Sequence, residues 1–230
     1  MEENKFKLTN ADLNAIKNGD SNYLNSKGAK LYREDNYKEA VEYYRVAAAL
    51  GNIDAVSNLG YCYLYGRSIK QNLSLALAYF EIAAVKENVE ACYKLGDIYE
   101  SDKWGVKDLE LSIYYYRMAA SFLIQLDWDV PYVILDTKEL QKYPSLCFAL
   151  GRQLMPGGVM PTDLDQAYQF LKQAEIGYGR EIANGSHFYK KAHNAVIDCL
   201  TDDIFDGIRE DYEDLDFDDV GFDDDIPFYD

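Results

Sequence analysis

The residues able to carry chemistry are few and widely separated. The two histidines, His187 and His193, lie six residues apart, which places them on different faces of a helix and favours solvent-facing or capping positions over metal ligation. No G-x-S-x-G motif or P-loop occurs. The four cysteines form no C-x-x-C pair and lack a histidine at zinc spacing; they are Cys62, Cys92, Cys147 and Cys199. The sequence therefore predicts no catalytic residue, no metal and no cofactor.

The carboxylates are concentrated near the end of the sequence. Of the net charge of −17, residues 201–230 carry −13, so the first 200 residues carry only −4. A calcium loop starting at Asp216 would place Val220 at its fifth position and would lack the bidentate glutamate. Carboxylates in such a run also lack the fixed separation that a glycosidase requires. An enzyme of unrecognised class is therefore the weakest hypothesis for the function.

Composition narrows the class of partner. A hydrophobic content of 48%, with 14% aromatic residues, is typical of a globular chain. No apolar run is long enough to span a bilayer, and the first ten residues, MEENKFKLTN, contain no secretory h-region. With no disulfide pattern either, the sequence predicts a cytoplasmic protein. The negative charge argues against nucleic acid and anionic membrane as partners, and leaves a basic protein or peptide surface open.

One pattern recurs at a fixed spacing. The hexapeptides YYRVAA, YFEIAA and YYRMAA begin 36 residues apart, at Tyr43, Tyr79 and Tyr115. Each alanine pair follows a glycine, by 19 residues in the first copy and by 23 in the next two, and a fourth copy keeps the distance of 23 residues. These glycines are Gly28, Gly60, Gly96 and Gly151. Four copies, three of which keep the same internal distance, predict a repeat architecture.

Each copy predicts two helices joined by a polar turn. The second helix is apolar at i, i+3, i+4 and i+7, and its expected N-caps are Asn72, Asp108 and Asp163. Two helices with a short connection pack antiparallel. We expect glycine and alanine to let the two backbones approach, and the aromatic rings to fill the space between successive hairpins.

The motif A-x-x-x-L-G-x-x-Y, followed by a glycine-bearing loop and A-x-x-Y-[YF]-x-x-A-A, resembles that of the Sel-one-like repeat family, relatives of the tetratricopeptide repeats. The resemblance covers about residues 21–178. It implies an all-α fold, a right-handed α-α superhelical solenoid of about four helical hairpins. It also implies a scaffold for protein complexes, with no catalytic residues of its own.

Other segments surround these repeats. We expect an N-terminal cap segment at residues 1–20, a C-terminal capping helix at 179–200 and an acidic tail at 201–230. The capping helix should begin at Ser186 and bury one side that includes Phe188 and Val196. About 19 extra residues separate the third and fourth copies, within an insert at 126–142. For this insert, a Pro-broken connection with a short helix packed on the solenoid is favoured over a loop that forms one wall of a groove.

The first helices of the repeats are the expected binding surface. If tetratricopeptide geometry carries over, they line a concave face suited to an extended or helical peptide. The candidate partner-binding residues, placed at fixed distances from the repeat glycines, are Asn25, Arg33, Ser57, Tyr61, Tyr93, Asp97, Glu100, Phe148 and Arg152. Plain packing between repeats is the alternative interpretation of the three aromatic residues in this set.

The acidic tail interleaves aromatic residues with carboxylates. Such a pattern is as consistent with a docking segment as with a disordered solubilising tail, and the candidate anchors are Phe217, Phe222, Phe228 and Tyr229. The leading hypothesis is a non-catalytic interaction scaffold that binds a protein or peptide through the concave face, the acidic tail, or both. The alternative is an acidic inhibitor or immunity protein that neutralises a basic enzyme such as a nuclease.

Overall fold

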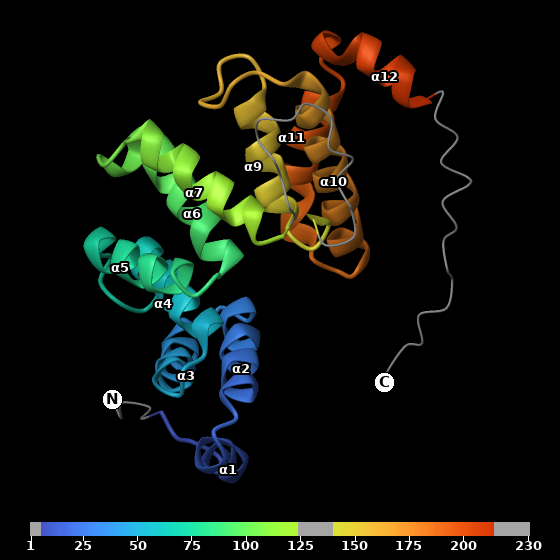
Figure 1. Cartoon of the computed structure of the whole chain (residues 1–230). Helices are drawn as coiled ribbons and strands as arrows, with labels where there is room; N and C mark the ends of the chain where they lie inside the picture. The colour runs from blue at the N-terminus through green and yellow to red at the C-terminus, as the bar shows by residue number, and fades with distance from the viewer. Residues whose placement is uncertain (1–5, 124–139, 214–230) are drawn as a thin grey trace.

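The computed structural model of the chain describes residues 6–123 and 140–213 (Figure 1). The described residues form helices and no strand. In chain order the α-helices are α1 (Asn10–Asn18), α2 (Ser21–Arg33), α3 (Tyr37–Ala49), α4 (Ile53–Tyr65), α5 (Leu73–Ala84), α6 (Val89–Glu100), α7 (Leu109–Ser121), α9 (Pro144–Leu154), α10 (Leu164–Ala183), α11 (Lys190–Leu200) and α12 (Asp206–Glu213). Short 3-10 helices form at η1 (Asp102–Trp104), η2 (His187–Tyr189) and η3 (Asp203–Phe205).

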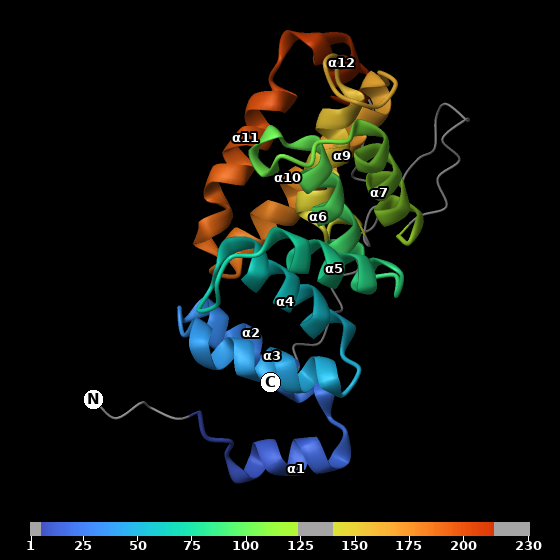
Figure 2. The same cartoon turned by 90° about the vertical axis from the view of Figure 1, so that its left-hand side faces the viewer.

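The helices pair into hairpins that stack in sequence order. α2 packs on α3, α4 on α5, α6 on α7 and α9 on α10, and the first helix of each pair carries the repeat glycine. Figures 1 and 2 show the hairpins following one another from α1 at one end to α11 and α12 at the other. The predicted all-α solenoid of four helical hairpins is thereby confirmed.

The predicted N-caps of the second helices form the expected hydrogen bonds. Oδ1 of Asn72 accepts from the backbone N–H of Leu75 at 3.0 Å, and Asp163 caps α10 through the N–H of Gln166 at the same distance. Asp108 accepts from two N–H groups at the start of α7. Each cap satisfies donors that have no partner within the helix, and so fixes where the second helix begins.

Each repeat glycine lies against a side chain of its own hairpin. A Cβ atom on Gly60 would lie 2.8 Å from a ring carbon of Phe80, which is closer than van der Waals contact allows. The same 2.8 Å distance recurs in the other hairpins, for Gly28 with Tyr44, Gly96 with Tyr116 and Gly151 with Leu171. The expectation that the rings fill the space between hairpins is therefore wrong for this position, because the ring lies inside the hairpin and needs a residue without a side chain opposite it.

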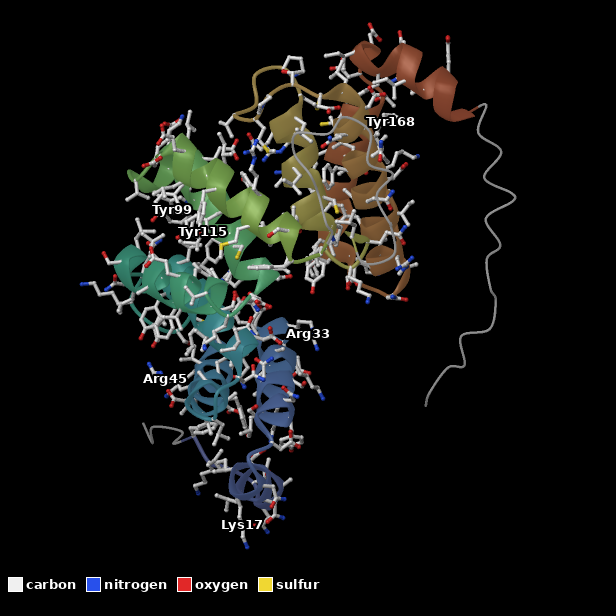
Figure 3. All side chains as sticks on the ribbon, viewed as in Figure 1. Lys17, Arg33, Arg45, Tyr99, Tyr115 and Tyr168 are labelled. Atoms are coloured by element: carbon white, nitrogen blue, oxygen red, sulfur yellow. The ribbon has the colours of Figure 1, made fainter. Side chains whose placement is uncertain are left out.

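The other aromatic residue of the motif also packs within its hairpin. The rings of Tyr63 and Tyr79 stack with centroids 5.4 Å apart, and those of Tyr99 and Tyr115 stack at 5.9 Å (Figure 3). These pairs join the first and second helices of the second and third hairpins. The Tyr-rich hexapeptides are thus structural, since their rings bind one helix of a hairpin to the other.

Polar side chains join the first helices of successive hairpins. The side-chain amide of Asn58 donates to Oδ1 of Asn25 at 3.1 Å, which links α4 to α2. The amide of Asn88, the N-cap of α6, donates to Oδ1 of Asp54 at 2.8 Å and links α6 to α4. Between α6 and α9 the polar contact is a looser ion pair, in which Arg152 lies 3.9 Å from Glu100. The helix α7 also contacts α9 less extensively than α3 contacts α4 or α5 contacts α6.

A buried ion pair fastens α1 to the first hairpin. The carboxylate of Asp12 is fully buried and accepts hydrogen bonds from Lys27 Nζ at 2.7 Å and from the hydroxyl of Tyr43 at 2.8 Å. It also accepts from the backbone and side chain of Thr9 at the start of α1. Burial opposes the charged form, but these donors outweigh burial and hold the pKa of Asp12 well below its usual value.

The C-terminal helices cover the outer side of the fourth hairpin. α10 continues to Ala183, and α11 packs on it with Val196 and Leu200 buried. Two details of the sequence prediction are wrong. Ser186 makes no capping hydrogen bond to the helix, which begins at Lys190, and Phe188 is 70% exposed because it belongs to η2 and points away from the core.

The beginning of the acidic tail is part of the fold. Phe205 in η3 is completely buried, and its ring lies 5.5 Å from that of Tyr168 on α10 (Figure 3). The guanidinium of Arg209 donates to the carbonyls of Leu200 at 2.7 Å and Asp202 at 2.9 Å and also contacts Asp206. Residues 201–213 therefore form a structured extension of the C-terminal cap.

Candidate functional site: a cleft between the first helices

A cleft in the described part of the chain lies where the third and fourth hairpins meet. This central cleft, of about 780 Å³, is lined by the C-terminal ends of α4 and α6, the turn around η1, and the C-terminal end of α9. The residues that define it in the following argument are Tyr65, Lys94, Asp97, Glu100, Asp102, Lys103, Trp104, Lys107 and Arg152. The volume lies in the range of ligand-binding sites, and the lining combines both signs of charge with aromatic rings.

Two carboxylates on α6 are fixed by one tyrosine of α7. The hydroxyl of Tyr116 lies 2.9 Å from Oδ1 of Asp97 and 3.0 Å from Oε2 of Glu100, so both carboxylates share a single donor. Burial, together with the two acids, raises the pKa of Tyr116 far above its usual value, and the hydroxyl stays protonated as that donor. The remaining acceptor positions of the carboxylates are available to a ligand.

Cations balance these carboxylates across the cleft. Nζ of Lys94 donates to Oδ2 of Asp97 at 2.6 Å, while Arg152 on α9 approaches Oε2 of Glu100 at 3.9 Å. Burial opposes the charge of Lys94, but Tyr93 and Asp97 outweigh it and raise the pKa of the ammonium. Arg152 therefore extends from the fourth hairpin toward the third, and its ion pair with Glu100 spans the cleft.

The turn after α6 contributes an aromatic wall. The Trp104 ring lies 6.4 Å from the ring of Tyr65, and Nζ of Lys103 stands 4.3 Å from the Trp104 centroid. Trp104 is only half-buried, so part of the indole faces the cleft. Tryptophan, tyrosine and arginine are the side chains that most often dominate binding energy at protein interfaces.

The aromatic candidates Tyr61 and Tyr93 lie beside the cleft on α4 and α6. Their hydroxyls are 3.5 Å apart, and the hydroxyl of Tyr61 is also 3.5 Å from Oε2 of Glu90. Nζ of Lys94 stands 4.8 Å from the ring of Tyr93. Burial and the neighbouring acids raise the pKa of both phenols. The pair is half-buried, so it both packs the repeats together and presents polar edges to the surface.

The nine residues proposed from the sequence divide into two groups. Six of them come together on α4, α6 and α9, namely Tyr61, Tyr93, Asp97, Glu100, Phe148 and Arg152. Within this group the guanidinium of Arg152 lies 5.2 Å from the centre of the Phe148 ring.

The remaining three lie elsewhere. Asn25 bonds to Asn58 in the ladder between repeats, Arg33 is exposed at the end of α2, and Ser57 is only 3% exposed. The assignment of Ser57 to a binding surface is therefore corrected, because its short side chain ends below the surface of α4. The tail anchors Phe217, Phe222, Phe228 and Tyr229 lie outside the described residues.

Sequence reasoning missed Lys94, Lys103 and Trp104. A signal for two of them was present, since the turn segment DKWGVKD carries a tryptophan between lysines, whereas turns usually favour small polar residues. Lys94 precedes Asp97 by three residues, a spacing at which opposite charges pair on a helix.

The described titratable side chains form no cluster of metal ligands. Among residues 6–123 and 140–213, no group of three or more His, Cys, Asp and Glu side chains is placed to hold a metal ion. All four cysteines are free thiols, and burial raises the pKa of Cys62 and of Cys92 to about 12. These two thiols are therefore protonated at neutral pH and are poor nucleophiles. No helix of the described part is long and apolar enough to cross a membrane.

The stacked hairpins define a protein of the helical-repeat class. The model of the Sel1 repeat matches residues 19–52, 53–84, 89–121 and 144–175. These segments cover more than half of the sequence, and the chain belongs to the Sel1 repeat family. Proteins of this family generally mediate protein–protein interactions and are typically non-catalytic scaffolds.

Solved structures agree with this fold. The chain is similar to a Sel1 repeat protein from Oxalobacter formigenes, with a TM-score of 0.54, 22% identity and coverage of 70% of this chain and 58% of that one. It is also similar to c5321, a protective antigen present in uropathogenic Escherichia coli strains that displays an SLR fold (TM-score 0.52, 20% identity, 75% of this chain and 35% of that one). This chain thus spans only part of the length of either protein, and the likeness concerns the fold alone. No curated protein matches the sequence.

Proposed function

We propose that the chain is a non-catalytic scaffold that binds an extended or helical segment of a protein partner in the central cleft. The observation that carries this proposal is the 780 Å³ cleft between first helices, with Trp104 and Tyr65 on one wall and Arg152 on another. The cleft offers acceptors at Asp97 and Glu100, donors at Lys103 and Arg152, and an aromatic face. That mixture suits a peptide backbone with polar side chains better than an apolar small molecule.

Cytoplasmic location is part of the proposal. All four cysteines are free, and three of them are buried, a state that a reducing compartment maintains. The acidic-inhibitor hypothesis rests on the acidic tail at residues 201–230, and most of that tail lies outside the described part of the chain. This hypothesis stays a prediction, and the binding experiment below distinguishes it from binding in the cleft.

The test compares matched aromatic substitutions on full-length protein. After partners have been identified by affinity capture, calorimetry measures the affinity of one purified partner for the wild type, Trp104→Ala and Tyr114→Ala. Tyr114 on α7 is 56% exposed and is not a cleft residue, so it serves as the control. We expect Trp104→Ala to weaken binding about 30-fold, the loss of a hot-spot residue, and Tyr114→Ala to change it less than about twofold.

A chain shortened to residue 213 separates the cleft from the tail. If binding is lost in the shortened chain while Trp104→Ala binds like the wild type, the acidic tail carries the interaction and the cleft proposal is wrong. Equal effects of Trp104→Ala and Tyr114→Ala would also contradict it.

A further inference from the structure

A second, smaller pocket lies on the same pair of first helices, at their N-terminal ends. This tyrosine pocket, of about 230 Å³, is formed where α6 and α9 begin, against the end of α10 and η2. Figure 1 shows the α6–α7 hairpin beside α9 and α10, so the pocket belongs to the same inter-hairpin junction as the central cleft. The residues that matter below are Glu90, Tyr93, Lys142, Tyr143, Glu181 and Tyr189.

The walls of the tyrosine pocket are aromatic and held in place. The ring of Tyr189 packs against two others, 4.2 Å from Phe188 and 5.2 Å from Tyr178. Tyr178 is itself fixed by a 3.0 Å hydrogen bond from its hydroxyl to Ser145. On α6, Tyr93 contacts the hydroxyl of Tyr61 and the ammonium of Lys94. Rings fixed in this way present π-surface to a ligand without an ordering cost.

Two glutamates from different helices give the tyrosine pocket its charge. Glu90 belongs to the first turn of α6, and Glu181 comes from the last turn of α10, where one of its oxygens accepts from Ser186 Oγ at 3.2 Å. Lys142 is the single cation among the described lining residues, which leaves the lining with one net negative charge. Desolvation and the nearby Asp54 raise the pKa of Glu90, against the opposing effect of Lys94, so a further positive charge at this carboxylate would be favourable.

We propose that the tyrosine pocket receives a lysine or arginine side chain of the protein partner. Carboxylates neutralise the charge, and the faces of tyrosine rings attract a cation as it loses water. A volume of 230 Å³ admits one long side chain and excludes a folded element. This inference rests on the proposed function and adds to it the class of side chain that is recognised. The partner segment is expected to carry a basic residue that lies at the N-terminal ends of α6 and α9.

The experiment uses single-residue probes on the full chain. N-acetyl-lysine methylamide and N-acetyl-arginine methylamide are titrated and followed by amide chemical shifts in NMR spectra. The norleucine analogue, which has a similar chain without the charge, is the matched control. We expect saturable binding of the basic probes at about millimolar affinity, with shifts at the residues of the tyrosine pocket and none from norleucine.

Charge variants give the sign of the interaction. Glu90→Gln with Glu181→Gln should weaken the basic probes about tenfold, whereas Lys142→Gln should strengthen binding. Circular dichroism checks that the double glutamate variant is folded. The proposal is overturned if the folded double variant binds the basic probes more tightly, or if Lys142→Gln binds them more weakly. Equal chemical shift changes from the norleucine analogue, or the absence of saturable binding, would also overturn it. If the basic probes fail while partner affinity still depends on Trp104, only this inference falls. If they bind while partner affinity ignores Trp104, only the proposed function falls.

Discussion

The second and third hairpins meet differently from the third and fourth, although all are copies of one repeat. Between the second and third, the repeat glycines are 36 residues apart, Asn88 bonds to Asp54, and the hydroxyls of Tyr61 and Tyr93 approach each other. Between the third and fourth the glycines are 55 residues apart, and the two pockets open on the same junction. The junction with the longer connection is thus the one on which both pockets open.

The fourth hairpin is supported by segments outside the repeat motif as well as by the core that it shares with the third. Phe205 packs on α10 from one side, and Leu140, at the end of the insert, is completely buried. Gln141 donates to Gln173 at 3.0 Å and accepts from Arg180 at 2.7 Å, so the last residues of the insert are tied to α10. The last repeat of the array is thus also stabilised by segments outside the repeat motif.

The largest effect should come from removing that support. Phe205→Ala is expected to lower the free energy of unfolding by about 3–5 kcal/mol, the usual cost of truncating a buried phenylalanine. Phe188→Ala, 17 residues earlier and 70% exposed, is the matched control and should change it by less than about 0.5 kcal/mol. Urea unfolding followed by circular dichroism measures both. Equal, small effects of the two would mean that residues 201–213 do not stabilise the fourth hairpin.

A smaller effect should separate the repeat glycines of the two regions. A Cβ at Gly60 meets the rigid ring of Phe80 at 2.8 Å. At Gly151 it meets Cγ of Leu171 at the same distance and the backbone carbonyl oxygen of Ala167 at 3.2 Å. Gly60→Ala should cost about 1–2 kcal/mol, because overpacking exceeds the gain of about 1 kcal/mol in helix propensity. Gly151→Ala should cost less, about 1 kcal/mol, since leucine can change rotamer and the contact with the Ala167 carbonyl requires a shift of only a few tenths of an ångström. Unfolding midpoints in urea compare the two, and a larger loss at Gly151 would reverse the explanation.

Sequence reasoning reached the hairpins because their signals are local. The glycine-to-alanine distance and the caps at Asn72, Asp108 and Asp163 act within one hairpin, and all appear in the structure. The sequence prediction failed where the exposure of a residue depends on the length of its own side chain. Ser57 and Tyr93 occupy equivalent sites 36 residues apart, yet the serine is buried and the tyrosine reaches the surface.

The C-terminal segment shows a second limit. Phe188 fits the apolar face of a continued helix and is exposed, while Phe205 lies in an acidic run and is buried. Only the path of the chain past α10 distinguishes them, and that path depends on tertiary contacts. The central cleft could not be predicted from the sequence either, because it is formed by the spacing between two hairpins and by the turn that carries Trp104.

Hydrogen exchange on the complex with the purified partner tests the central claim most directly. If the partner binds in the central cleft, amides of residues 94–107 and 148–159 should exchange more slowly in the complex, while those of α5 and α2 should not change. Protection confined to residues 201–213 or to α5 and α7, with the cleft segments exchanging as in the free protein, would contradict the account.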